Sequence, residues 1–295
     1  QHYLDSLFKK LKQDTVNYLI DLYNQGQFLE TINYAQLILK KYPEEIKVWN
    51  IIGAANKGLN RIGDAILAFK RVTKLNPNYA IGHNNLGIVL HEAGKLEKAV
   101  EAYNDAITIK ADYYEAYYNM GNALKDLHKL EKAVKIYKKA TVFNPVYFEA
   151  YYNMGNVLKD QDKLKEAIEV YKKAISLKPD CVYVYNNMGC IFNDQGKFKE
   201  AIDNFNKALS LKYDFPEAFN NMGMALKGQG KLEEAIEAYN KALFLKPDYA
   251  EAFYNMGIIL QYQGKLEECI DSFNKALSIK PDYAEANNNM GVALQ

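Results

Sequence analysis

Asparagines recur at one fixed spacing along most of the chain. Seven of them stand 34 residues apart in an unbroken row, here called the asparagine file: Asn85, Asn119, Asn153, Asn187, Asn221, Asn255 and Asn289. A carboxamide offers two N–H donors and an acceptor oxygen, so a row of carboxamides can hydrogen-bond a peptide backbone whose side chains vary. Asparagine in mid-helix costs roughly half a kcal/mol against alanine, so something must offset that cost. We predict that the file binds an extended peptide.

Positions beside the asparagine file vary from copy to copy. Tyr118, Tyr152 and Tyr254 directly precede file members, and we assign them as walls that pack against a ligand's side chains. Asn122 and Asn156, three positions after file members, complete the predicted peptide-binding set. The alternatives are that duplication copied the file, or that each amide bonds to the adjacent helix and stiffens the array. On the binding hypothesis, alanine replacements should weaken binding without a parallel loss of stability.

Histidines and cysteines do not form the pattern of a catalytic or metal site. His83 and His91 lie eight residues apart, not the four of a helical metal pair. Cys181, Cys190 and Cys269 lack the spacing of metal ligands. The chain also has no phosphate-binding glycine loop and no nucleophile elbow. We therefore predict no enzyme, no cofactor and no metal.

Charge and hydropathy exclude several kinds of partner. The chain carries 37 Lys and Arg against 36 Asp and Glu, so no net field attracts nucleic acid or an anionic membrane surface. Its longest apolar runs are a few residues, far short of the roughly 20 that span a bilayer. We expect a protein or peptide partner, no nucleic acid, no membrane insertion and a cytoplasmic location.

The elements that position the file repeat with the same period. A glycine recurs at every 34th residue, at Gly53, Gly87, Gly121, Gly155, Gly189, Gly223, Gly257 and Gly291. A fixed period of this length is typical of a solenoid, whose units stack because none can bury its apolar face alone. The function must then lie on the surface that the stack presents.

Each repeat reads as two helices. In residues 114–147, apolar residues follow helical spacing in two stretches, which predicts an antiparallel pair. The turn between them holds residues that tolerate a left-handed backbone, namely Gly94, Gly196, Gly230, Gly264, Asn60, His128 and Asp162. His128 is therefore expected to be a turn residue and not a catalyst.

The repeats set the domain organisation. Residues 1–45 are expected to hold an N-terminal capping helix, with apolar residues from Tyr3 to Leu11, and a degenerate repeat. That repeat has Leu19 in place of glycine and Ala35 in place of an aromatic residue. Residues 46–295 then divide into 46–79, 80–113, 114–147, 148–181, 182–215, 216–249, 250–283 and a partial 284–295.

The 34-residue set of glycine, alanines, aromatic residue and proline resembles the tetratricopeptide repeat family. In the second helix, small residues such as Ala133 and Ala140 alternate with a large aromatic such as Tyr137, and a proline such as Pro145 follows. The resemblance covers residues 12–295. It implies an all-α fold, a right-handed superhelical solenoid of helix-turn-helix repeats whose first helices line a concave groove.

The asparagine file also resembles a ladder in the tetratricopeptide superhelix of O-linked N-acetylglucosamine transferases. The resemblance implies that these amides hold the backbone of extended protein substrates, although no transferase domain is present in these residues. Chaperone-binding relatives instead clamp a terminal carboxylate with lysine and asparagine. Asn122 and Asn156 match that asparagine, but Tyr118 and Tyr152 stand where lysine is expected, which argues against such a clamp.

Three functional hypotheses remain from the sequence. The leading one is a non-catalytic protein-interaction module that holds an extended peptide in its groove. A second is a self-assembling scaffold, in which end-to-end association would stack residues 284–295 on another copy. The third is the substrate-recruiting arm of a larger transferase.

Overall fold

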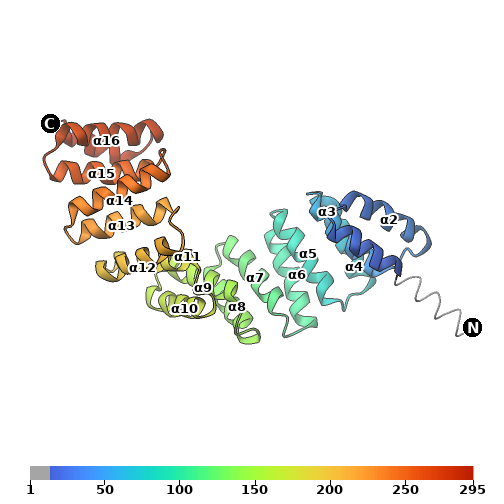
Figure 1. Cartoon of the computed structure of the whole chain (residues 1–295). Coiled ribbons are helices and arrows are strands. Elements are labelled where there is room, and N and C mark those ends of the chain that lie inside the picture. The colour runs from blue at the N-terminus through green and yellow to red at the C-terminus, as the bar shows by residue number, and fades with distance from the viewer. Residues whose placement is uncertain (1–13, 295) are drawn as a thin grey trace, which may run out of the picture. The chain divides into compact units, whose positions relative to one another are not determined.

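The computed structural model describes residues 14–294, and all regular structure within them is helical (Figure 1). The predicted capping helix at Tyr3 to Leu11 lies outside the described residues. Residues 14–24 are helical and precede α2 (Phe28–Lys41). The predicted all-α repeat fold is confirmed.

The remaining helices alternate between a first and a second member of each pair. The first helices are α3 (Ile46–Gly58), α5 (Ala80–Glu92), α7 (Tyr114–Asp126), α9 (Phe148–Asp160), α11 (Val182–Asp194), α13 (Pro216–Gly228), α15 (Ala250–Tyr262) and α17 (Ala284–Ala293). The second helices are α4 (Ile62–Leu75), α6 (Leu96–Ile109), α8 (Leu130–Phe143), α10 (Leu164–Leu177), α12 (Phe198–Leu211), α14 (Leu232–Leu245) and α16 (Leu266–Ile279).

The chain forms two compact units, residues 1–157 and 158–295, with the division inside α9. Within each unit the two helices of a pair pack together, and the second helix also packs on the first helix of the next pair. First helices contact each other directly, α5 with α7 in one unit, and α11 with α13, α13 with α15 and α15 with α17 in the other. A residue at the same place in successive first helices therefore lies near its counterpart.

Turns between paired helices have the expected backbone conformation. Asn60, His128 and Asp162 have φ of 56°, 56° and 58°, in the left-handed region. Glycines occupy this turn in the other pairs with φ from 70° to 77°. Asn, Asp and His are the non-glycine types that tolerate this conformation best, so the interpretation of His128 as a turn residue is confirmed.

Glycine on the first helix packs directly on the aromatic ring of the second. A Cβ atom added to Gly189 would lie 2.5 Å from a ring carbon of Phe205, and one added to Gly121 would lie 2.5 Å from Tyr137. The predicted small residues of the second helices, such as Ala133 and Ala167, are fully buried. Close packing of this kind fixes the angle between paired helices and hence the place of each file residue.

In the degenerate first repeat, the large and the small side chain that face each other between the paired helices have exchanged places. Leu19 stands where other repeats have glycine, and Ala35 stands where they have the aromatic ring. Both are fully buried and belong to one apolar cluster with Val48 and Ile52 of α3. The large side chain has moved from the second helix to the first, so the space between the helices remains filled.

α17 lacks a second helix in the residues that the structure describes. A Cβ atom added to Gly291 would meet no atom within 4 Å, whereas its counterparts Gly223 and Gly257 meet aromatic rings. Val292 and Leu294 are 56% and 65% exposed. This end of the second unit therefore presents an uncovered apolar face.

Candidate functional site

The asparagine file places one carboxamide on each first helix from α5 to α17. Each member is the sixth residue of its helix and is half-buried. Because successive first helices contact each other within a unit, the amides of neighbouring repeats lie close enough to interact through single side chains.

In the first unit, each file amide donates a hydrogen bond to the preceding repeat. The donor is Nδ2 and the acceptor is the side chain of the fifth residue of the previous first helix. The bonds are Asn85 to Asn50 Oδ1 at 3.0 Å, Asn119 to Asn84 Oδ1 at 3.1 Å, and Asn153 to the Tyr118 hydroxyl at 3.2 Å. Each bond joins residues 35 apart, so the file links each repeat to the one before it.

The second unit repeats this arrangement. Here Nδ2 of Asn221 donates to Asn186 Oδ1 at 3.1 Å, Nδ2 of Asn255 to Asn220 Oδ1 at 3.1 Å, and Nδ2 of Asn289 to the Tyr254 hydroxyl at 3.1 Å. Asn187 donates to the Tyr171 hydroxyl at 3.3 Å. The structural role that the sequence left as an alternative is therefore present in the geometry. Alanine replacements would remove these bonds, so we expect them to lower stability as well as binding.

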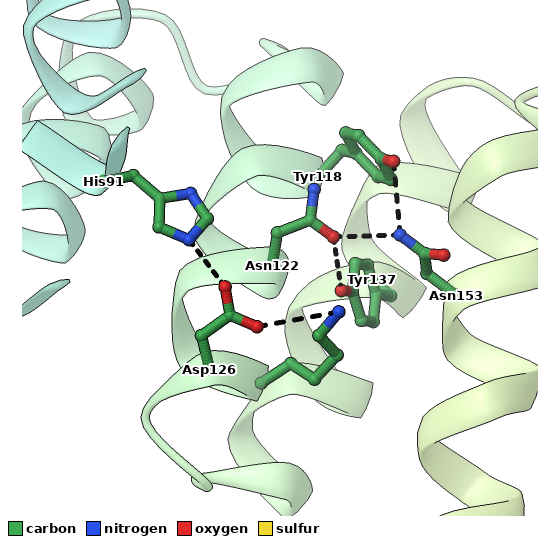
Figure 2. A network of polar contacts seen from close by, with 7 residues as sticks. His91, Tyr118, Asn122, Asp126, Tyr137 and Asn153 are labelled. Carbon is green, nitrogen blue, oxygen red and sulfur yellow. Dashed lines mark hydrogen bonds and ion pairs between the residues drawn. The ribbon is translucent and has the colours of Figure 1, made fainter. Parts of the chain in front are cut away.

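One part of each amide is not used by these bonds. Among the residues that the structure describes, no protein donor bonds to Oδ1 of Asn119, Asn153, Asn221 or Asn255. In Figure 2, the oxygen of Asn153 points away from Tyr118 and Asn122. The inter-repeat bond thus fixes the amide through its nitrogen and leaves its oxygen available to another donor.

Asn122 lies at the centre of a polar network in the first unit (Figure 2). Its Oδ1 accepts hydrogen bonds from the Tyr137 hydroxyl at 2.7 Å and from Nδ2 of Asn153 at 2.9 Å. Burial raises the pKa of Tyr137 above its ordinary value, so its hydroxyl remains a neutral donor. Both acceptor positions of Asn122 Oδ1 are therefore occupied within the protein.

The predicted tyrosine walls also contact neighbouring protein side chains. The Tyr118 ring packs beside Tyr147 with centroids 5.1 Å apart, and the Tyr254 ring packs beside Tyr283 at 4.9 Å. Tyr152 stacks on Phe148 at 6.0 Å, and Asn156 is half-buried one helical turn after Asn153. Tyr118 and Tyr254 thus position file amides of the next repeat through their hydroxyls, while their rings pack on the last residue of their own repeat.

Sequence reasoning missed the acceptors Asn50, Asn84, Asn186 and Asn220. A signal for them was present, because the fifth residue of each first helix from α3 to α17 is Asn or Tyr, both of which carry an acceptor oxygen. Residues one place apart on a helix point in different directions. On neighbouring helices, however, the fifth and sixth positions come together.

The remaining candidates for chemistry have structural contacts. A ring nitrogen of His83 lies 2.9 Å from the carbonyl oxygen of Pro77, and Cys269 is fully buried against Phe273 and Leu260. Burial raises the pKa of the Cys190 thiol to about 11, so it is a neutral thiol at physiological pH. In residues 14–294, no three His, Cys, Asp or Glu side chains are grouped as metal ligands would be. None of the helices described is both long and apolar enough to cross a bilayer.

Comparison with known families identifies the repeats. A family model described as "TPR repeat" matches residues 89–127, 121–162, 189–230 and 225–262, about half of the chain. Models described as "Tetratricopeptide repeat" match residues 46–79, 68–101, 148–181 and 250–283. A comparison with curated protein sequences found no match.

Solved structures share the fold. YrrB, described as a TPR protein with an unusual peptide-binding site, is 28% identical with a TM-score of 0.54, over 65% of this chain and 99% of YrrB. A MamA structure is 30% identical with a TM-score of 0.53, over 55% of this chain and 95% of MamA. The APC/C hetero-tetramer Cut9-Hcn1 is 17% identical with a TM-score of 0.61, over 91% of this chain and 53% of the other. This chain belongs to the tetratricopeptide repeat family, whose repeats form protein-interaction modules.

Proposed function

We propose that this chain binds an extended protein segment across its first helices, and that the asparagine file hydrogen-bonds the backbone of that segment. The observation that carries the proposal is the geometry of the file amides. Nδ2 is anchored to the preceding repeat, while no protein donor in the described residues bonds to Oδ1 of Asn119, Asn153, Asn221 or Asn255. Such an oxygen suits a peptide N–H donor.

Anchoring favours binding for an entropic reason. A free asparagine side chain loses rotamer freedom when it bonds to a ligand, and that loss costs affinity. The bonds of Asn221 and Asn255 to the preceding repeat already hold these side chains in one orientation. These side chains then lose their rotamer freedom when the protein folds, so the loss does not reduce the affinity for the peptide. The peptide N–H groups bond to acceptors that are already oriented.

This proposal revises the expected roles of the neighbouring residues. Tyr118 and Tyr254 orient the amides of Asn153 and Asn289 in addition to forming walls beside a ligand. Asn122 supports Asn153 from within the protein, since its oxygen is saturated, and it can offer a ligand only its N–H group. The similarity to YrrB, which is described as having a peptide-binding site, supports a peptide as the partner.

A pair of matched variants tests the proposal. The ladder variant carries Asn153→Ala, Asn221→Ala and Asn255→Ala, which removes both the inter-repeat bond and the ligand-facing oxygen. The acceptor variant carries Tyr118→Phe, Asn186→Ala and Asn220→Ala, which removes bond acceptors and leaves the file intact. Peptides selected from a random library displayed on phage provide the ligand, and fluorescence anisotropy gives the affinity.

The two variants should differ in binding. The ladder variant should also lose somewhat more stability, because Asn153 and Asn221 each make a second bond to the preceding repeat, to Asn122 and Cys190. Each lost inter-repeat bond costs about 1 kcal/mol of unfolding free energy. The ladder variant should in addition lose about 1 kcal/mol of binding free energy per missing oxygen, or more than tenfold in affinity for a peptide bound by Asn221 and Asn255 of the second unit. Equal affinities of the two variants would refute a ligand-binding role for the file.

A further inference from the structure

A second row of paired side chains runs between first helices, six to seven residues beyond the file. Nζ of Lys57, the twelfth residue of α3, lies 3.0 Å from a carboxylate oxygen of Glu92, the thirteenth residue of α5. Nε2 of His91 on α5 lies 2.7 Å from Oδ2 of Asp126 on α7 (Figure 2). In these two pairs, a basic residue at the twelfth place contacts an acid 35 residues later, whereas Lys125 at the same place lies 3.6 Å from Asp126.

In other repeats, the sequence also places an acid 35 residues after a lysine at the twelfth place of a first helix. Lys125 and Lys159 are each followed 35 residues later by an aspartate, and Asn193, which is uncharged, is followed by the uncharged Gly228. Lys227 departs from this rule, because Tyr262 stands where its carboxylate would be. Within the described part of the chain, Lys227 has no ion pair.

Nearby carboxylates are engaged elsewhere. Glu233 accepts a hydrogen bond from Nε2 of Gln263 at 3.3 Å, and Glu234 lies 3.6 Å from Nζ of Lys231. In the described residues, neither acid at the start of α14 forms an ion pair with Lys227.

Lys227 lies at an apolar pocket of about 490 Å³, a volume typical of sites for small ligands or single side chains. The other lining residues are Gly230, Leu232, Ile258, Ile259 and Tyr262. Tyr262 is 86% exposed, although an aromatic ring of this size is usually buried. Ile258 and Tyr262 follow Asn255 on α15 at i+3 and i+7, so the pocket continues the stripe of the helix that carries the file.

We propose that this pocket binds a carboxylate against Lys227 with an adjoining apolar group against Ile258 and Tyr262. The ligand's acid takes the place of the acid that pairs with Lys57 and His91 in the first unit. The inference deepens the proposed function, since it selects an extended segment that carries a carboxylate next to an apolar side chain. That carboxylate is either an Asp or Glu side chain or a chain terminus.

The pocket can be tested without a peptide. The probe is 3-phenylpropionate, which joins an aromatic ring to a carboxylate, and the controls are acetate and the uncharged 3-phenylpropionamide. We expect NMR titration of the whole chain with 3-phenylpropionate to shift the Ile258 methyl resonances, with at least fivefold weaker binding of either control. Acetate binding as tightly as 3-phenylpropionate, or shifts confined to other residues, would overturn the proposal.

Two substitutions test the missing ion pair. Lys227→Gln should weaken 3-phenylpropionate binding by about tenfold, as expected for loss of one charge-assisted hydrogen bond. Tyr262→Asp should weaken it similarly, because it restores an internal partner for Lys227. The control Lys199→Gln removes the same charge from an exposed site and should leave binding unchanged. Unchanged binding by Lys227→Gln, with the folded NMR spectrum preserved, would contradict the proposal.

Two peptides then separate the sources of the carboxylate. Both are flexible Gly-Ser chains with a single Phe. In the first peptide, Phe is followed by Glu and a C-terminal amide. The second peptide ends at Phe with a free C-terminal carboxylate. The one that depends more strongly on Lys227 identifies the source, and independence of both from Lys227 would overturn the proposal. The ladder variant keeps the pocket, so it should still bind 3-phenylpropionate. Failure of the file hypothesis and failure of the pocket hypothesis therefore give different results.

Discussion

At the scale of single residues, the two polar groups of a file amide have different roles. Nδ2 of Asn255 bonds to Asn220, while Oδ1 is the proposed acceptor for a ligand. From the sequence, the cost of asparagine in a helix indicated that some interaction offsets it, but not which one. Both the type and the period of the residue could be predicted, whereas the orientation of the amide depends on the fifth residue of the preceding first helix.

Two buried tyrosines at the same place in their repeats should respond differently to loss of the hydroxyl. Tyr137 donates to Asn122 at 2.7 Å, whereas the buried hydroxyl of Tyr239 has no hydrogen-bond partner in residues 14–294. Tyr137→Phe should lower the unfolding free energy by about 1 kcal/mol. Tyr239→Phe should leave it unchanged or raise it slightly, because an unpaired buried hydroxyl costs free energy.

Urea unfolding of the two variants measures this difference. Phe205 and Phe273 occupy the same place in other repeats, so the phenylalanine ring fits there without strain. A larger loss of stability for Tyr239→Phe than for Tyr137→Phe would show that the polar network around Asn122 contributes little.

At the scale of helices, the sequence period identified which faces are buried. Ala167 on α10 is fully buried, and Lys159 on α9 is half-buried and close enough to lower the pKa of the Cys190 thiol through its charge. Ala167→Leu should overfill the contact between helices and cost about 1–3 kcal/mol. Lys159→Ala should change the unfolding free energy by less than about 0.5 kcal/mol. Chemical denaturation of both variants measures their unfolding free energies. A larger loss for Lys159→Ala than for Ala167→Leu would show that the buried and exposed faces have been assigned the wrong way round.

The open face of α17 predicts local fraying. Val292 and Leu294 are exposed, and no aromatic ring covers Gly291. Since the stability of a repeat array depends on contacts between neighbours, amides of α17 should exchange with solvent faster than those of α13 in the same unit. Hydrogen exchange at low protein concentration measures this. Equal protection of α17 and α13 in a monomeric sample would contradict the prediction, and protection that rises with concentration would support end-to-end association.

The sequence predicted some features of the helix pairs and not others. The 34-residue period predicted the helix pairs and the left-handed turn residues such as His128. It did not reveal that in the first repeat the large residue, Leu19, takes the glycine position and the small residue, Ala35, takes the aromatic position. The packing of two helices depends on the summed volume of the two facing side chains and not on either residue alone.

At the scale of the whole molecule, many of the polar contacts between repeats join residues 35 apart, one more than the period. Asn119 to Asn84 and His91 to Asp126 are examples from two different rows. A period in a sequence shows which residues are equivalent, but it does not show which residue touches the next repeat. That offset follows from the packing of the helices, so the fold and the file could be predicted and the partners of the file could not.

The central claim is that file oxygens accept hydrogen bonds from a ligand's backbone. The most direct measurement is a double-mutant cycle between the ladder variant and a selected peptide whose alternate backbone amides are N-methylated, which removes N–H donors and keeps every side chain. We predict that methylation weakens binding to the unaltered chain by about fivefold per lost hydrogen bond and has little effect on binding to the ladder variant. Equal sensitivity of both proteins to methylation would contradict the claim.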